Sequence, residues 1–140
     1  MPSAPPIGLK HSKTLTVDAG LTVPQVSPAF ADFRGMPAVF ATAYLVGFVE
    51  ATCLEALKPY LADGRMTVGT HIDISHSAAT PIGMTVTATV ELIAVEGRRL
   101  RFRVECRDDA EPIGAGHHDR VIIDPPKFIA RVEAKRRKAG

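Results

Sequence analysis

The sequence has no tryptophan, only two cysteines among its 140 residues, and a net charge of only +2. Cys53 and Cys106 are too few for a disulfide framework or a four-thiolate metal site, and both fall in apolar patterns, where cysteine packs as a small hydrophobe. This use of cysteine is typical of a reducing, cytoplasmic compartment. The small net charge and an aromatic content of 6% do not suit a nucleic-acid-binding protein, so we expect no such partner.

Long apolar runs are also missing. The longest one covers residues 37–49, is interrupted by Thr42 and Gly47, and ends at Glu50. A helix that crosses a bilayer needs ~20 apolar residues. The proline-rich N-terminus has no apolar segment behind a basic start, so it does not resemble a secretion signal. The sequence therefore predicts a soluble protein with no membrane partner.

The length and composition predict a single domain. A chain of 15.0 kDa with 46% hydrophobic residues is large enough to bury a core but small for two domains. We expect one domain over residues 1–140. Its ends, residues 1–8 with their prolines and residues 135–140 with a basic run, are expected to be flexible.

A long buried helix is predicted over residues 38–61. Pro37 suits the first turn of a helix, and the Asp63-Gly64 pair suits its end. Apolar side chains cover nearly every face of its first three turns, and a helix that is apolar all round has to be enclosed.

The rest of the chain alternates between apolar and polar residues, which predicts antiparallel strands. The expected strands cover residues 9–18, 84–92, 99–107, 113–124 and 128–133. One further strand places Val68, Thr70, Ile72, Ile74 and His76 on one face. Phe30, Phe33 and Met36 recur at three-residue spacing in the loop before the helix, which suggests a short helical turn or a lid. These elements predict an α+β fold in which a sheet wraps the helix and a second copy of the chain completes its burial.

Three polar residues are candidates for chemistry. Glu50 lies in the buried helix pattern, so its carboxylate has to be paired, protonated or beside water, unless it reaches solvent near the helix end. Thr42 precedes it by about two turns and can share its side of the helix, although threonine in a helix usually serves packing. His76 follows Ile72 and Ile74 on an apolar face and is either a core histidine or a base.

Common motifs for other chemistries are absent. No pair of histidines has the spacing of a zinc motif, so we expect no metal site. The sequence also has no G-x-S-x-G element, no P-loop lysine and no dinucleotide glycine fingerprint. These absences remove the commonest hydrolase, nucleotide-binding and hydride-transfer classes.

Three segments carry a family resemblance: MPAVFATAYLVGFVE at residues 36–50, VGTHIDISHSAATPIG at residues 68–83, and IGAGHHDRV at residues 113–121. Together with the VEGRRL hairpin they resemble the fluoroacetyl-CoA thioesterase branch of the hot-dog superfamily. The similarity covers the chain from about Phe30 almost to its C-terminus. It implies a hot-dog fold and a homodimer with active sites near the subunit interface.

The resemblance also implies roles for individual residues. It assigns thioester hydrolysis to Thr42, Glu50 and His76, and places Gly69 at the thioester oxygen and Arg120 at the substrate. Phe33 matches the first of two phenylalanines that close over the acyl group in that family. The second position is Met36 here, which departs from the pattern and bears on selectivity for a fluorinated acyl group.

We therefore expect a cytoplasmic, homodimeric acyl-CoA thioesterase for a short acyl chain, with coenzyme A as part of the substrate and no separate cofactor. Either Thr42 attacks the carbonyl, with His76 as base and Glu50 orienting the imidazole, or Glu50 and His76 activate water directly. Two other functions stay open at this point: an acyl-CoA hydratase, which hot-dog folds also host, and a binder that sequesters a small acyl compound without catalysis.

Overall fold

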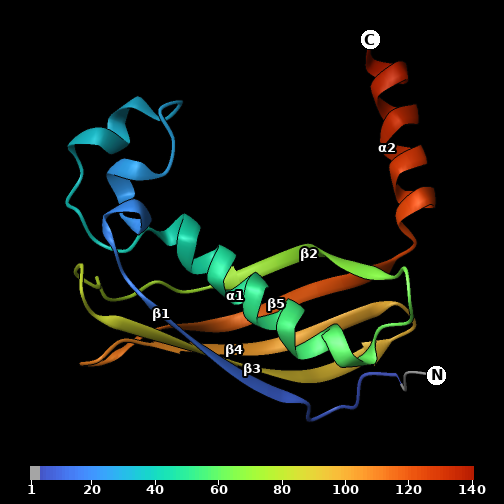
Figure 1. Cartoon of the computed structure of the whole chain (residues 1–140), viewed down its shortest axis with the longest axis horizontal. Coiled ribbons are helices and arrows are strands. Elements are labelled where there is room, and N and C mark those ends of the chain that lie inside the picture. The colour runs from blue at the N-terminus through green and yellow to red at the C-terminus, as the bar shows by residue number, and fades with distance from the viewer. Residues whose placement is uncertain (1–3) are drawn as a thin grey trace.

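A computed structural model describes residues 4–140 and shows one long helix lying across a five-stranded antiparallel sheet (Figure 1). The sheet has the order β1-β3-β4-β5-β2, which leaves β1 and β2 at its edges. The elements are β1 (Lys10–Thr16), η1 (Ala19–Leu21), η2 (Val23–Gln25), η3 (Ala31–Gly35), α1 (Thr42–Leu57), η4 (Lys58–Tyr60), β2 (Met66–Ile74), β3 (Thr85–Glu96), β4 (Arg99–Arg107), β5 (Pro112–Ile123) and α2 (Pro125–Ala139). The predicted α+β architecture is confirmed.

The core lies between α1 and the sheet face that it covers. Alternate residues of β3 and β4 are buried there, as the period of two predicts: Val86, Ala88, Val90, Leu92, Leu100, Phe102, Val104 and Cys106. Helix α1 contributes Leu45, Phe48, Val49, Thr52, Cys53, Ala56 and Leu57. The polar residues between the buried ones on β3 and β4 face away from the core.

The start of α1 differs from the prediction. The helix begins at Thr42, and residues 39–41 are extended because their backbone groups bond to other segments. The N–H of Phe40 donates to the carbonyl of Thr80 at 2.9 Å, and that of Ala41 donates to Leu21 at 3.0 Å. The buried hydroxyl of Thr80 in turn donates to Asp108 at 2.8 Å. These contacts fix the first residue of α1, Thr42, relative to the sheet.

One side of α1 is open in the single chain, although the sequence predicts an enclosed helix. Ala43 and Gly47 are exposed, and Leu54 is 42% exposed. The neighbouring sheet edge, β2, is also open, and its Ile72 is 41% exposed. The unpaired edge strand and the open side of α1 are the surfaces that a second copy would need to cover.

Strand β2 contains a bulge that the alternation does not predict. Its register against β5 shifts between Gly69 and His71, so Thr70 is the extra residue. The strand ends at Ile74, and His76 lies beyond it. The prediction that Val68, Ile74 and His76 share one strand face is therefore wrong, because the bulge inverts the alternation and the strand stops short of His76.

The C-terminal segment is a helix. Residues 128–133, predicted as a strand, belong to α2, which starts after Asp124 with two prolines at its first positions and carries three basic residues in its last turn. No residue of α2 is buried, and Figure 1 shows it standing away from the sheet. The predicted flexible end at residues 135–140 falls within this helix as far as Ala139. Of the other predicted flexible end, residues 1–3 lie outside the described residues.

Candidate active site

Thr42 and His76 form a direct pair at the start of α1. The threonine Oγ1 lies 2.6 Å from Nδ1 of the imidazole. Thr42 is exposed, whereas His76 is half-buried beside the ring of Phe40, whose centroid is 6.4 Å from that of the imidazole. A hydroxyl that contacts a histidine nitrogen is the arrangement in which the histidine can remove the hydroxyl proton.

The environment of His76 keeps it neutral. Burial lowers the pKa of its imidazole, because the charged form is poorly solvated there. Its Nε2 atom is buried and has no hydrogen-bond partner among residues 4–140. Nδ1 is therefore the nitrogen of His76 that is available for proton transfer with Thr42.

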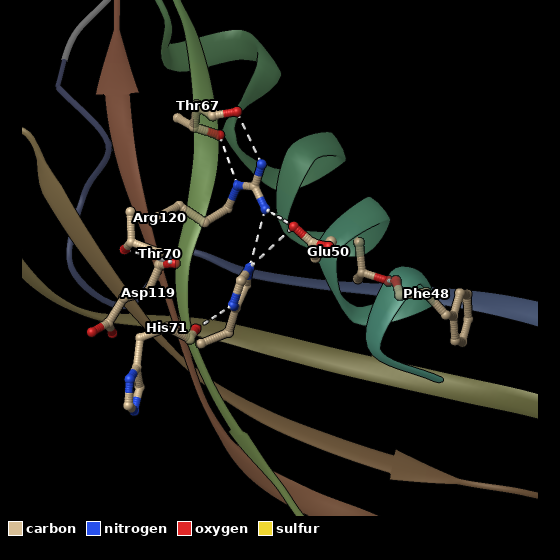
Figure 2. Close-up of polar contacts among 9 residues, drawn as sticks. Phe48, Glu50, Thr67, Thr70, His71, Asp119 and Arg120 are labelled. Atoms are coloured by element: carbon tan, nitrogen blue, oxygen red, sulfur yellow. Dashed lines mark hydrogen bonds and ion pairs between the residues drawn. The ribbon is translucent and has the colours of Figure 1, made fainter. Parts of the chain in front are cut away.

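Glu50 is paired with Arg120. The arginine Nη1 donates to Oε2 of Glu50 at 2.8 Å, and Figure 2 shows the carboxylate directed from α1 towards the guanidinium. Arg120 is buried and also donates from Nε to Thr67 Oγ1 at 2.8 Å and from Nη2 to the Thr67 carbonyl at 2.9 Å. The carboxylate predicted to be paired, protonated or beside water is thus paired with a buried cation.

Gly69 borders this ion pair. A Cβ at position 69 would lie 2.6 Å from Oε2 of Glu50 and 3.3 Å from Nη1 of Arg120. The absence of a side chain therefore leaves room for the carboxylate. Beside it is a cleft of about 350 Å³ between α1 and β2, lined by Val46, Glu50, Gly69, Thr70, His71, Ile72 and His118.

The segment before α1 forms the predicted helical turn, η3. The ring of Phe30, just before η3, packs against that of Phe33 within it, with centroids 5.3 Å apart and a tilt of 56°. Phe33 is half-buried, whereas Phe30 and Met36 are 52% and 50% exposed. The apolar groups of this segment are thus available to cover a small ligand.

The structure does not bring all the predicted site residues together within one chain. Glu50 contacts Arg120 and His118, whereas His76 contacts Thr42, and no hydrogen bond or ion pair joins Glu50 to His76 among the described residues. Thr42 and Glu50 are eight residues apart on α1, about 12 Å along its axis. Glu50 therefore does not orient the His76 imidazole in the single chain.

Two members of the Glu50 cluster were not singled out from the sequence. His118 donates from Nδ1 to the His71 carbonyl, 2.7 Å away, and its Nε2 lies 3.1 Å from Nη1 of Arg120. Thr67 supports the other end of the guanidinium. The signal for His118 was its position two residues before Arg120, which places both side chains on one strand face.

The structure does not support a cysteine nucleophile, a metal site or a membrane-spanning helix among the described residues. Burial raises the pKa of the Cys53 thiol to about 12 and that of Cys106 to about 11, so neither is a nucleophile near neutral pH. Within residues 4–140, no three histidine, cysteine or acidic side chains cluster as metal ligands would. No helix in the same range has the length and apolarity needed to traverse a bilayer.

Residues 22–126 match the model of the fluoroacetyl-CoA-specific thioesterase family. The chain belongs to this family. It is 43% identical over 129 residues to the fluoroacetyl-CoA thioesterase of Streptantibioticus cattleyicolor, covering 92% of this chain and 93% of that protein. Its predicted membership of the fluoroacetyl-CoA thioesterase branch, and its predicted class as a thioester hydrolase, are confirmed.

Solved structures of related thioesterases have the same fold. The fluoroacetyl-CoA thioesterase FlK superposes with a TM-score of 0.90 at 42% identity, over 93% of this chain and 96% of that one. A thioesterase superfamily member from Thermus thermophilus gives a TM-score of 0.84 at 26% identity, over 97% of this chain and 98% of that one. The predicted hot-dog fold is confirmed. FlK variants have been solved with acetyl-CoA and with fluoroacetate and CoA.

Proposed function

We propose that this chain hydrolyses short-chain acyl-CoA thioesters to the free acid and coenzyme A, with Thr42, His76 and Glu50 as the catalytic residues. The 2.6 Å contact between Thr42 and His76 is the observation that supports this function most strongly. Water and the side chains of the site supply the chemistry, so no cofactor is required. Two free, buried cysteines fit a reaction that takes place in the cytoplasm.

In the proposed reaction, Oγ1 of Thr42 attacks the thioester carbonyl carbon while Nδ1 of His76 takes the hydroxyl proton. The carbon–sulfur bond breaks, and His76 returns the proton to the leaving CoA sulfur. Water then attacks the acyl ester on Thr42, and its proton passes through His76 to the threonine oxygen, which releases the acid. The lowered pKa of His76 suits the first step, because a neutral imidazole is present near neutral pH.

A homodimer explains how Glu50 takes part. We propose that β2 pairs with β2 of a second copy, which closes the open sheet edge and covers the open side of α1. A twofold axis places the N-terminal half of each α1 beside the C-terminal half of its partner. Thr42 and His76 of one chain then face the cleft at Glu50 and Gly69 of the partner subunit, with the thioester between them.

Within that cleft, Glu50 and Gly69 have separate proposed roles. The Glu50 carboxylate orients the attacking water, and the Gly69 backbone holds the thioester oxygen. The guanidinium of Arg120 is bound to Thr67, Glu50 and His118, so we propose that this residue acts on the substrate through Glu50.

We propose a small acyl group because the apolar side chains of η3 and of Met36 come shortly before the Thr42 end of α1 in the chain. Phe33 supplies a ring to cover the acyl chain, and Met36 supplies a flexible thioether in place of a second ring. The substrates that fit this description best are acetyl-CoA, fluoroacetyl-CoA and related small thioesters. Met36 favours an enzyme that does not depend on fluorine for recognition.

Thiol release from a panel of short acyl-CoA thioesters tests the proposed function. We expect steady turnover with at least one of them, and a mass of twice 15.0 kDa by light scattering at micromolar concentration. Stoichiometric binding without thiol release would support the non-catalytic binder instead. Loss of an enoyl-CoA double bond without thiol release would support the hydratase. A monomer with full activity would contradict the two-chain site.

A further inference from the structure

His118 has a place in the Glu50 cluster that the proposed reaction does not use. Its side chain points from β5 to the α1 side of the sheet and is only 2% exposed. Arg120 lies two residues further along the same strand, on the same face. Oε2 of Glu50 is 3.9 Å from Nε2 of His118, with Nη1 of Arg120 in contact with both.

The two neighbours of the ring fix where its proton lies. The His71 carbonyl can only accept a hydrogen bond, so Nδ1 of His118 carries the hydrogen and donates it. The Arg120 guanidinium can only donate, so Nε2 of His118 is the acceptor. Burial lowers the pKa of His118, as does the charge of Arg120, and both favour this neutral form.

His118 and Glu50 bind the same nitrogen of Arg120. Nη1 has two hydrogens in the plane of the guanidinium, one for each acceptor. Thr67 holds the other side of that plane through Nε and Nη2. With Thr67 and His118 both bound, the direction in which Arg120 presents its remaining hydrogen to Glu50 is fixed.

The same ring also reaches the bulge of β2. His71 is the first residue after the register shift, and its carbonyl accepts from His118. The bulge contains Gly69, whose missing side chain leaves space for the Glu50 carboxylate. His118 therefore connects the backbone at the cleft to the cation that holds Glu50.

We propose that His118 is a positioning residue: the hydrogen bond from Nδ1–H to the His71 carbonyl leaves Nε2 as the acceptor for Arg120, and this second hydrogen bond sets the orientation of the Glu50 carboxylate. This inference rests on the proposed function for its effect on turnover. The tautomer itself is a property of the structure, independent of any reaction.

Two variants separate the two hydrogen bonds of the ring. In His118→Gln the amide oxygen reaches about as far as Nε2 and keeps an acceptor for Arg120. In His118→Asn the shorter amide takes the place of Nδ1 and keeps only the donor to His71. We expect His118→Asn to lower kcat about tenfold with little change in KM, the usual scale for losing one hydrogen bond to a charged group. His118→Gln should retain most of the wild-type kcat.

The neighbouring residue His117 provides the matched control, because it lies on the opposite face of β5. His117→Asn and His117→Gln should both leave kcat unchanged. An equal decrease of kcat in His118→Asn and His118→Gln, or a wild-type kcat in both, would overturn the positioning role. A general loss of packing would lower the thermal stability of both His118 variants, and it would lower kcat in His118→Gln as well as in His118→Asn.

Nitrogen NMR of histidine-labelled protein tests the tautomer without any assay of activity. The His118 signals are assigned as those that disappear in His118→Gln. At pH 7.5 they should show a protonated Nδ1 and an unprotonated Nε2. A protonated Nε2 would overturn the proposal even in an active enzyme. If the wild type releases no thiol, the proposed function fails, while this spectrum still decides whether His118 holds Arg120 as we infer.

Discussion

Arg120 donates a hydrogen bond from Nη1 to Oε2 of Glu50 at 2.8 Å, across 70 residues of sequence. The arginine is buried and the carboxylate side chain is 39% exposed, so the pair joins the interior of the sheet to the wall of the cleft. A cation held inside the protein thereby fixes the acidic side chain that lines the candidate substrate cleft.

Replacing Arg120 with lysine is expected to weaken this arrangement although the charge is kept. The ammonium of lysine has no planar fork and cannot serve Thr67, Glu50 and His118 together. We expect Arg120→Lys to lower the free energy of unfolding by about 1–3 kcal/mol, because buried acceptors lose their donors. Urea denaturation measures this change, and a variant as stable as the wild type would show that the contacts of Arg120 are dispensable.

A methyl group at position 69 is expected to displace the Glu50 carboxylate. The Cβ of Gly69→Ala would sit 2.6 Å from Oε2 of Glu50, closer than real Cβ contacts, and 3.1 Å from Cε1 of His118, which is tighter than most of them. The position is at the open edge of the sheet, so we expect the fold to persist and kcat to fall about tenfold or more. Circular dichroism checks the fold, and thiol release checks the rate. Wild-type turnover in this variant would remove Gly69 from the site.

The stability of the protein should decrease in mildly acidic solution. Burial lowers the pKa of both His118 and His76 below the ordinary value of 6.5. At mildly acidic pH the unfolded chain therefore binds more protons than the folded protein does. The contribution of these two histidines to the free energy of unfolding is complete above pH 6.5 and decreases as the pH falls below that value. Urea denaturation between pH 5 and 8 measures this slope. His118→Gln should have a smaller slope, and an identical slope would show that His118 is not held neutral.

Met36 is expected to govern selectivity more than rate. A small group in an apolar pocket changes discrimination by only ~1–3 kcal/mol. We therefore predict that acetyl-CoA or another unfluorinated short thioester is hydrolysed with a kcat/KM within about a hundredfold of that for fluoroacetyl-CoA. Met36→Phe should shift the ratio towards the fluorinated substrate. A natural enzyme that already prefers fluoroacetyl-CoA by many orders of magnitude would contradict this role.

Local patterns in the sequence predicted most of the fold. The period of two along β3 and β4 gave correct strands because one face of each is buried by α1. The helix start was wrong by four residues because Phe40 and Ala41 form backbone hydrogen bonds with Thr80 and Leu21, which no local pattern contains. The strand at residues 128–133 was wrong because its short apolar pattern also fits one face of a helix, and the two prolines after Asp124 favour a helix start.

The candidate site could be predicted only in part for the same reason. Thr42, Glu50 and His76 were named from their residue types and from the family resemblance. Their pairing depends on contacts between distant elements: Thr42 with His76 across 34 residues, and Glu50 with Arg120 across 70. The place of His118 additionally depends on the bulge in β2, which alternation alone does not reveal.

The central claim, that Thr42 and His76 act as one unit in thioester hydrolysis, is tested most directly by kcat in a double-mutant cycle. His76→Ala should lower kcat by on the order of 10²-fold or more, the usual scale for the loss of a general base. Thr42→Ala should be slower than Thr42→Ser, which keeps the hydroxyl. Because the two side chains share one proton transfer, the double variant Thr42→Ala with His76→Ala should be about as slow as the slower single variant. If the two losses multiply instead, or if His76→Ala turns over at the wild-type rate, the pair is not the catalytic unit.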